Sequence, residues 1–486
     1  MGSAARISTG VERLDHILGG GLPAARFHLV QGNPGSGKTT LGLQFLIEGL
    51  RRGESVLYVT LSETREELQA VAESHGWDVS NLPVFELAAG VQYLSLAEQN
   101  TLFEPSEVEL AEVTRALLEE FERVKPRRVV FDSLSEMRLL AQSTLRYRRQ
   151  LLALKQHFSE RGTTVLMADD RTSEEGDLQL QSLAHGVISL EQLSPLYGAE
   201  RRRLRVVKMR GVDFRGGYHD FRIERGGLRI FERMVAAEHH EPFAPEVVKS
   251  GVSELDALLG GGLDRGTSAL IIGPAGSGKS VVSMQYACAA ALRDETACIY
   301  AFDEGLHTVR VRAKAMGQPI DELLAKGNLR IQQIDPAEMS PGELADTVRN
   351  DVEARGARVV VIDSLNGYLA AMPEENFLII QLHELLSYLR QRGVLVILVV
   401  AQAGLIGQMN SPVDVSYLAD TVLMLRFFEI RGEVRKALSV LKRRSGVHAT
   451  DIRELTMDGH GVRIGSKLAN LHGVFTGVPR IFEDGE

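Results

Sequence analysis

The sequence predicts an α/β protein with two tandem domains, each a mostly parallel sheet flanked by helices and extended by a C-terminal hairpin. Short runs rich in Val, Ile and Leu alternate with stretches whose apolar residues follow helical spacing, such as 108–123 and 377–392. Runs that are apolar on both faces are typical of parallel strands covered by helices. The chain also repeats itself at a distance of 241 residues, from Lys38 to Lys279. A period that long indicates a duplicated domain.

Four apolar runs in each copy are predicted to form the parallel strands. They lie at 27–31, 55–61, 127–133 and 163–169 in the first copy, and at 268–273, 297–302, 358–364 and 394–402 in the second. Hairpin-like strands end each copy, as at 204–211 and 219–231 of the first. A polar stretch with two prolines then follows, which is typical of a linker. We therefore expect domains at 1–235 and 249–486, joined by a linker at 236–248.

The composition is that of a globular protein, with 44% hydrophobic and 24% charged residues. The formal net charge of −9 gives no general attraction for a polyanion, so we do not expect nucleic acid as a partner. The two cysteines have no metal-like or redox-like spacing, and the N-terminal residues lack the apolar core of a signal peptide. The longest apolar run, 394–401, is too short to cross a membrane. We therefore expect a cytoplasmic protein with no membrane partner.

Each copy carries the pattern G-x-x-x-x-G-K-[ST], at 32–39 and at 273–280. In this pattern glycines let backbone N–H groups turn toward phosphate, and the following helix adds its N-terminal dipole. The lysine reaches the β- and γ-phosphates of ATP. We expect nucleotide contacts from Gly32, Asn33, Pro34, Gly35, Ser36, Gly37, Lys38, Thr39 and Thr40, and from Gly273, Pro274, Ala275, Gly276, Ser277, Gly278, Lys279, Ser280 and Val281.

An acidic residue at the end of a neighbouring buried strand would complete a magnesium site. Asp132 and Asp363 each close an apolar run with the sequence Asp-Ser-Leu. Together with the P-loop hydroxyl, such a carboxylate holds Mg²⁺ next to the phosphates. The expected metal-binding residues are Thr39, Asp132, Ser280, Asp303 and Asp363.

Hydrolysis also needs a carboxylate that orients or deprotonates water. The positions that follow the next strand read Ser62-Glu63 in the first copy and Asp303-Glu304 in the second. Glu63, Asp303 and Glu304 are therefore the candidate bases, acting with Lys38 and Lys279. For the first copy an alternative stays open, because Ser-Glu-Thr is also a good helix N-terminal signal.

With these residues placed, the chain resembles the KaiC family, the double-domain ATPases and autokinases of the cyanobacterial clock. The resemblance rests on LDxxLGGGL-like segments ahead of both P-loops, on SHGWD at 74–78, and on the stretches at 199–211 and 427–455. It implies two tandem RecA-like P-loop NTPase domains that assemble as a homo-hexameric double ring. Clock or signalling proteins would be its partners.

The resemblance also implies that ATP is held between subunits. Lys208 and Arg210, and likewise Lys442 and Arg444, match basic residues that reach the nucleotide of a neighbouring subunit, as an arginine finger does. A solvated strand edge is the alternative interpretation of each Lys-x-Arg. The residues that the resemblance adds to nucleotide binding are Ser74, Lys208, Met209, Arg210, Lys442, Arg443, Arg444 and His448.

The family's adjacent Ser-Thr phosphorylation sites read Ser416-Tyr417 in this chain. The resemblance therefore implies autophosphorylation of Ser416, with Asp303 as the base. We expect an ATPase and serine autokinase that uses ATP and Mg²⁺ in signalling or timekeeping. Two alternatives remain open at this point: a RecA-like DNA-dependent ATPase, and a nucleotide-gated scaffold with little hydrolysis.

Overall fold

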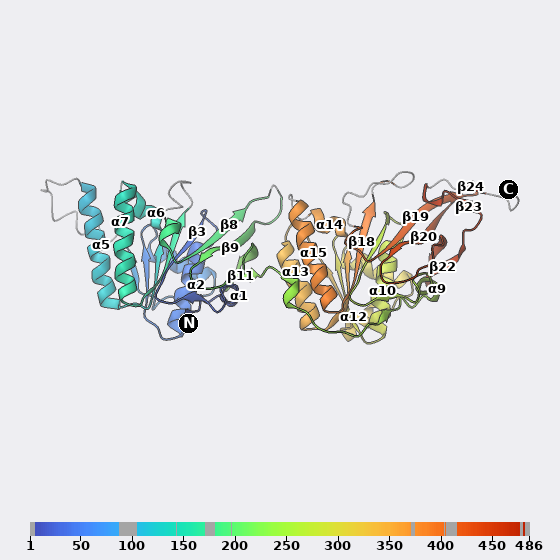
Figure 1. The fold of residues 1–486 in the computed structure, drawn as a ribbon, viewed down its shortest axis with the longest axis horizontal. Helices are drawn as coiled ribbons and strands as arrows, with labels where there is room; N and C mark the ends of the chain where they lie inside the picture. Colours follow the sequence, from blue (N-terminus) through green and yellow to red (C-terminus); the bar gives the residue numbers. More distant parts are fainter. Residues whose placement is uncertain are drawn as a thin grey trace. The chain divides into compact units, whose positions relative to one another are not determined.

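A computed structural model describes residues 5–86, 105–141, 143–170, 180–195, 197–370, 375–402, 404, 416–476 and 480–481. The chain divides into two compact units, Met1–Arg233 and Met234–Glu486 (Figure 1). Within the described residues, no helix is both long enough and apolar enough to span a bilayer.

The first unit contains a sheet of nine strands in the order β11-β10-β9-β8-β3-β7-β6-β4-β5. Strands β8, β3, β7, β6, β4 and β5 run parallel to one another. The remaining pairs, β8 with β9, β9 with β10 and β10 with β11, are antiparallel. The strands are β3 (Phe27–Gly32), β4 (Val56–Thr60), β5 (Val84–Glu86), β6 (Arg128–Asp132), β7 (Thr164–Asp170), β8 (Gly186–Leu193), β9 (Arg201–Met209), β10 (His219–Glu224) and β11 (Gly227–Phe231).

Helices cover both faces of this sheet, which explains why its central strands are apolar on both sides. One buried cluster joins the sheet to α1 (Glu12–Ile17), α2 (Lys38–Arg51) and α3 (Arg65–Ser74). The other joins it to α5 (Pro105–Val124), α6 (Leu134–Ala141) and α7 (Thr144–Glu160). Figure 1 shows α5 and α7 on one side of the first sheet and α2 on the other.

The second unit repeats this topology strand for strand, in the order β16-β15-β17-β18-β14-β19-β20-β21-β22. Its strands are β14 (Ser268–Pro274), β15 (Thr296–Ala301), β16 (Leu329–Gln333), β17 (Ala357–Asp363), β18 (Leu395–Gln402), β19 (Thr421–Ile430), β20 (Glu433–Arg443), β21 (Arg453–Asp458) and β22 (Gly461–Lys467). Its helices are α9 (Ser253–Leu258), α10 (Lys279–Leu292), α11 (Leu306–Ala315), α12 (Ile320–Lys326), α13 (Pro341–Glu353), α14 (Leu365–Ala370) and α15 (Glu375–Gln391). The predicted fold class is therefore confirmed.

Two-stranded pairs and short 3-10 turns complete the units. The pairs are β1 (Arg6–Ile7) with β2 (Leu22–Pro23), β12 (Val247–Val248) with β13 (Leu263–Asp264), and β23 (Leu471–His472) with β24 (Arg480–Ile481); the 3-10 turns are η1 (Ala236–Glu238) and η2 (Val474–Thr476). The segment at 236–248 packs on the second unit. The Ala236 N–H donates to Glu384 at 3.2 Å, and Arg392 pairs with Glu241 at 2.7 Å.

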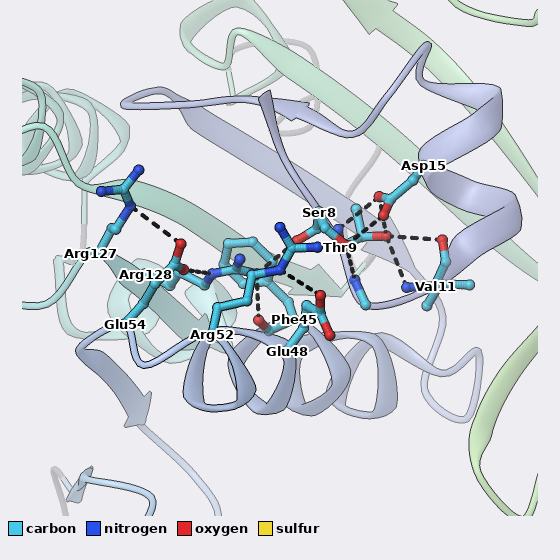
Figure 2. A network of polar contacts seen from close by, with 11 residues as sticks. Ser8, Thr9, Val11, Asp15, Phe45, Glu48, Arg52, Glu54, Arg127 and Arg128 are labelled. Carbon is cyan, nitrogen blue, oxygen red and sulfur yellow. Dashed lines mark hydrogen bonds and ion pairs between the residues drawn. The ribbon is translucent and has the colours of Figure 1, made fainter. Parts of the chain in front are cut away.

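The repeated Leu-Asp ahead of each P-loop has a structural role. Asp15 on α1 accepts hydrogen bonds from the Ser8 hydroxyl at 2.6 Å and from the Thr9 N–H at 2.7 Å (Figure 2). Asp256 on α9 accepts from the Ser250 N–H at 2.8 Å in the same way. The aspartate thus fixes the turn that leads into the first helix of each unit, which explains why this sequence segment occurs in both units.

Candidate functional site

The two P-loops connect the central strand of each sheet to the helix that follows it. Gly37 and Gly278 immediately precede α2 and α10, with φ angles of +97° and +105° that side-chain-bearing residues rarely adopt. Thr40 and Val281 follow in the first helical turn with buried side chains. The other loop residues begin inside the strands, because Gly32 ends β3 and Gly273 and Pro274 end β14, and residues 33–36 and 275–277 then connect each strand to its helix. Each loop therefore aims a helix N-terminus at the strand-end edge of its sheet, which is where an anion is favoured.

Both P-loop lysines lie along their own loops with little exposed surface. Lys38 Nζ donates to the Gly32 carbonyl at 2.8 Å and forms an ion pair with Asp170 at 2.7 Å. Lys279 Nζ donates to the Pro274 carbonyl at 2.7 Å. Burial alone would raise the pKa of Asp170, but the hydrogen bond and charge of Lys38 outweigh it, so this pKa lies below its usual value. Asp170, at the end of β7, is a site residue that the sequence analysis did not identify.

The predicted magnesium ligands lie together in each unit. Thr39 Oγ1 donates to Asp132 Oδ2 at 2.6 Å, and the buried Tyr58 hydroxyl donates to the same oxygen at 2.7 Å. Ser280 hydrogen-bonds to Asp363 in the second unit. Burial raises the pKa of Asp363, and the Ser280 hydroxyl offsets part of this rise. A hydroxyl beside a carboxylate is the hard-oxygen donor set that Mg²⁺ prefers, so the residues fit the ion.

Glu63 has the surroundings of a base. One carboxylate oxygen, Oε2, is buried and has no hydrogen-bond partner among the described residues. Burial, with the negative charges of Asp132 and Glu67, raises the pKa of Glu63 to about 6. The helix N-terminal signal of Ser-Glu-Thr comes from its threonine, because Thr64 caps α3 and forms a capping box with Glu67, which leaves Glu63 outside that box. The backbone of Glu63 is fixed by Thr60, whose Oγ1 accepts a hydrogen bond from the Glu63 N–H at 2.9 Å.

The two candidate carboxylates of the second unit have different partners. Asp303 accepts a hydrogen bond from the Ser364 hydroxyl at 2.5 Å. Glu304 instead forms an ion pair with Arg312 of α11, whose Nη1 donates to both carboxylate oxygens. The sequence analysis missed Arg312. These groups line a cavity of about 190 Å³, together with other residues that include Lys279, Ser280, Asp363 and Ser364.

The Lys-x-Arg residues of the first unit lie away from its P-loop. Lys208 Nζ donates to the Gln181 carbonyl, and Arg210 donates to the Ser182 carbonyl at 2.8 Å. Both contacts lie just before β8, which starts level with the beginning of β3. The P-loop follows the opposite end of β3. These cations therefore lie at the strand-start edge of the sheet, whereas their own P-loop lies at the strand-end edge.

The second unit has the same arrangement. Lys442 Nζ donates to the Ser416 carbonyl at 2.9 Å, and Arg444 donates to the Tyr417 carbonyl at 3.1 Å. The segment that carries the predicted phosphorylation site is thus held by the predicted basic residues. The residue of the first unit that corresponds to Ser416 is Gln181, because Lys208 contacts the Gln181 carbonyl as Lys442 contacts the Ser416 carbonyl.

The register of β14 against β19 places Ser416 far from its own P-loop. Ala269 pairs with Thr421 at the start of β14, and Gly273 lies beside Leu425 at the P-loop end. Four residues of extended strand separate these levels, which is about 13 Å. Ser416 precedes Thr421 and lies still further from the loop.

The remaining predicted nucleotide contacts lie elsewhere within their own units. Ser74 is the last residue of α3, and its hydroxyl donates to the Val71 carbonyl at 2.7 Å. Met209 is buried at the end of β9. Arg443 faces inward and pairs with Asp264 at 3.0 Å, while His448 is half-buried beyond β20.

Comparison with known proteins agrees with this architecture. A family model described as ATPase, KaiC, matches residues 7–235 and 248–469. The circadian clock protein KaiC3 of Synechocystis sp. is 26% identical over 485 residues, covering 98% of this chain and 94% of that protein. The circadian clock oscillator protein KaiC of Synechococcus elongatus is 27% identical over 487 residues, covering 98% of this chain and 92% of that protein. The chain therefore belongs to the KaiC family of ATPases, with two tandem RecA-like P-loop domains that bind ATP.

Proposed function

We propose that the first unit hydrolyses ATP with Glu63 as the base. The observation that carries this proposal is that Oε2 of Glu63 is buried and has no hydrogen-bond partner among the described residues, because a lone pair that accepts no hydrogen bond is available for a proton. Thr39 and Asp132 would hold Mg²⁺, which supplies charge for the phosphates. Lys38 would exchange its contacts with loop carbonyls and Asp170 for contacts with the β- and γ-phosphates.

The proposed reaction is a direct displacement. The water oxygen forms a bond to the γ-phosphorus while the bond from that phosphorus to the bridging oxygen breaks. ADP carries away the electron pair of the broken bond, and the Glu63 carboxylate takes the proton from water. Lys38 compensates the negative charge that develops on the bridging oxygen.

The second unit would act at its own P-loop with Lys279 and a carboxylate from the Asp303-Glu304 pair. Ser280 and Asp363, which share a hydrogen bond, would hold Mg²⁺ there. The cavity beside them is lined by Lys279, Asp303 and Asp363, so the groups needed for phosphoryl transfer face a common space.

We further propose that each nucleotide site is completed by a neighbouring copy of the chain. Lys208 and Arg210 lie at the edge opposite to their own P-loop, and we infer that they serve a P-loop of another copy. Lys442 and Arg444 have the same geometry in the second unit. A closed homo-hexameric double ring would satisfy both sets of contacts, since a head-to-tail interface whose rotation closes forms a ring.

Ser416 is the proposed autophosphorylation site, and the same geometry requires transfer between copies. Its hydroxyl oxygen would attack the γ-phosphorus of ATP held by a neighbouring Lys279 loop. The neighbour's Asp303 would take the hydroxyl proton, leaving ADP and phosphoserine. Phosphorylation near Lys442 and Arg444 would change the charge of this edge, which suits a signalling or timekeeping role with clock or signalling proteins as partners.

The test uses γ-labelled ATP with Mg²⁺, following both free phosphate and label retained on the protein. Lys38→Ala and Lys279→Ala separate the two P-loops, and Ser416→Ala removes the acceptor. Retained label that maps to Ser416 and disappears in Lys279→Ala supports the autokinase. Phosphate release without retained label leaves an ATPase alone. If neither appears, the chain is a nucleotide-gated scaffold and the proposed enzyme activity is wrong.

A further inference from the structure

The catalytic-position glutamates of the two units have opposite surroundings. Glu63 and Glu304 occupy matching positions, each just ahead of the matching helices α3 and α11. Glu63 leaves Oε2 buried without a hydrogen-bond partner among the described residues. Both oxygens of Glu304 accept from the Arg312 guanidinium. Among the described residues, the matching glutamates thus differ: Oε2 of Glu63 accepts no hydrogen bond, and both oxygens of Glu304 are held by a cation.

The difference comes from one position on the helix. Arg312 lies on α11, where the matching residue of α3 is Val71. Val71 is partly buried and packs against the apolar cluster of the first unit. A valine cannot donate a hydrogen bond, so Glu63 has no partner from this position, whereas the arginine at the matching place reaches Glu304.

The ion pair stands inside the phosphate site. Glu304 and Arg312 line the same cavity as Lys279 and Asp363, and the charge of Arg312 also acts on Asp363. The side chains of Arg312 and Glu304 are 23% and 35% exposed, so the pair is partly shielded from water and stronger than a surface pair. A guanidinium that donates to both oxygens occupies a lone pair on each and competes with an attacking water for this carboxylate.

We propose that Arg312 is a positioning residue that keeps Glu304 from acting as a base and so restrains water attack in the second unit. This inference rests on the proposed hydrolysis of ATP at that unit. Arg312 leaves Asp303 as the carboxylate that faces an acceptor, because Asp303 accepts a hydrogen bond from the Ser364 hydroxyl and forms no ion pair with a cation among the described residues. The second unit is thereby biased against hydrolysis by the identity of one residue.

The experiment measures steady-state phosphate release in a Glu63→Gln background, which silences the first unit and keeps its P-loop. Arg312→Val introduces the residue of the first unit, and Arg312→Lys keeps the positive charge. We expect Arg312→Val to raise kcat about threefold or more while KM for ATP stays within about twofold, a small part of the range of general-base effects. Arg312→Lys should stay near the parent value, since a cation still holds Glu304.

The reciprocal variant tests the same idea in the first unit. Val71→Arg, in a Lys279→Ala background, should lower kcat about threefold or more because the new cation would hold Glu63. Val71→Gln is the uncharged control and should fall less. Thermal melts of all variants identify a loss of folding.

The outcomes separate this inference from the proposed function. If release in the Glu63→Gln background depends on Lys279 but Arg312→Val fails to raise kcat, the inference is wrong and the proposed hydrolysis stands. The inference is also overturned if Arg312→Lys behaves like Arg312→Val. If Arg312→Val shows no release beyond its Lys279→Ala counterpart, hydrolysis at the second unit and its restraint by Arg312 are both wrong.

Discussion

Arg128 fills a space in the first unit that exists only because residue 49 is glycine. A Cβ placed on Gly49 would lie 2.7 Å from Arg128 Cδ. The arginine is fully buried, donates to Glu54 at 2.5 Å and to the Ser8 and Phe45 carbonyls at 2.7 and 2.9 Å (Figure 2). It thereby connects the sheet, the P-loop helix and the N-terminal turn.

In the second unit, two uncharged residues occupy the positions that correspond to Arg128 and Gly49. The strand pair that joins Val56 to Arg128 in the first unit joins Ala297 to Val359 in the second. Ala290 then takes the place of Gly49, and both Val359 and Ala290 are fully buried. Residue size and charge have therefore changed together at two contacting positions.

Gly49→Ala should destabilise the first unit. The added methyl group meets Arg128 and Val56 too closely, so we expect a loss of about 1–3 kcal/mol in the free energy of unfolding. The double variant Gly49→Ala/Arg128→Val installs the pair of the second unit and should be more stable than the sum of the single changes predicts. Urea unfolding of the four proteins measures this coupling, and strict additivity would contradict the proposed contact.

Phosphate release by the first unit should depend on pH through Glu63. Because the pKa of Glu63 is raised to about 6, its carboxylate is protonated below that pH and cannot accept a proton from water. In a Lys279→Ala background, kcat/KM should rise through about pH 6 and level above it. Glu63→Gln should abolish most of the activity at every pH. A profile with its midpoint near the ordinary glutamate value would argue against the buried base.

Asp132→Asn should weaken the use of magnesium by the first unit. The substitution removes the negative charge beside the Thr39 hydroxyl while keeping a similar shape. We expect the Mg²⁺ concentration for half-maximal release to rise about tenfold or more. A titration of phosphate release against Mg²⁺ measures this shift, with Asp363→Asn as the matched change in the second unit. An unchanged titration would exclude Asp132 from the metal site.

Mixing two inactive variants should restore phosphate release. Lys38→Ala removes the P-loop lysine, and Lys208→Ala removes a cation proposed to serve the neighbouring copy, both in a Lys279→Ala background. Mixed assemblies contain sites that combine an intact Lys38 from one copy with an intact Lys208 from another. Release that stays at the level of the separate variants after exchange of subunits would show that Lys208 does not act between copies.

Much of the fold was predictable because the sequence contains two copies of the same domain pattern. The P-loop patterns, the apolar runs and the shared 241-residue offset each predicted the same two α/β domains, and the family assignment is confirmed. Strands β5 and β16 were missed because short edge strands carry few apolar residues. The contact of Lys38 with Asp170 also escaped prediction, since it joins the first residue of α2 to the last residue of β7, which are distant in sequence.

Arg312 escaped prediction for a different reason. Its role depends on which face of α11 turns toward Glu304, and helical spacing alone does not say which acid a surface arginine meets. The available signal was the comparison of the two copies, in which Val71 of the first copy corresponds to Arg312 of the second. The roles proposed for Lys208 and Ser416 came from the family resemblance, because each would involve a second copy of the chain.

The separation of P-loop and Lys-x-Arg across each sheet has a consequence for how the proposed enzyme responds to its own abundance. In the proposed arrangement, a lone chain would carry every group for catalysis but could not combine them in one complete site. Activity per molecule would then fall on dilution, and a chain damaged at one edge would inactivate the site that it shares with an intact neighbour. Hydrolysis of ATP by the proposed enzyme would therefore depend on the concentration of the chain itself.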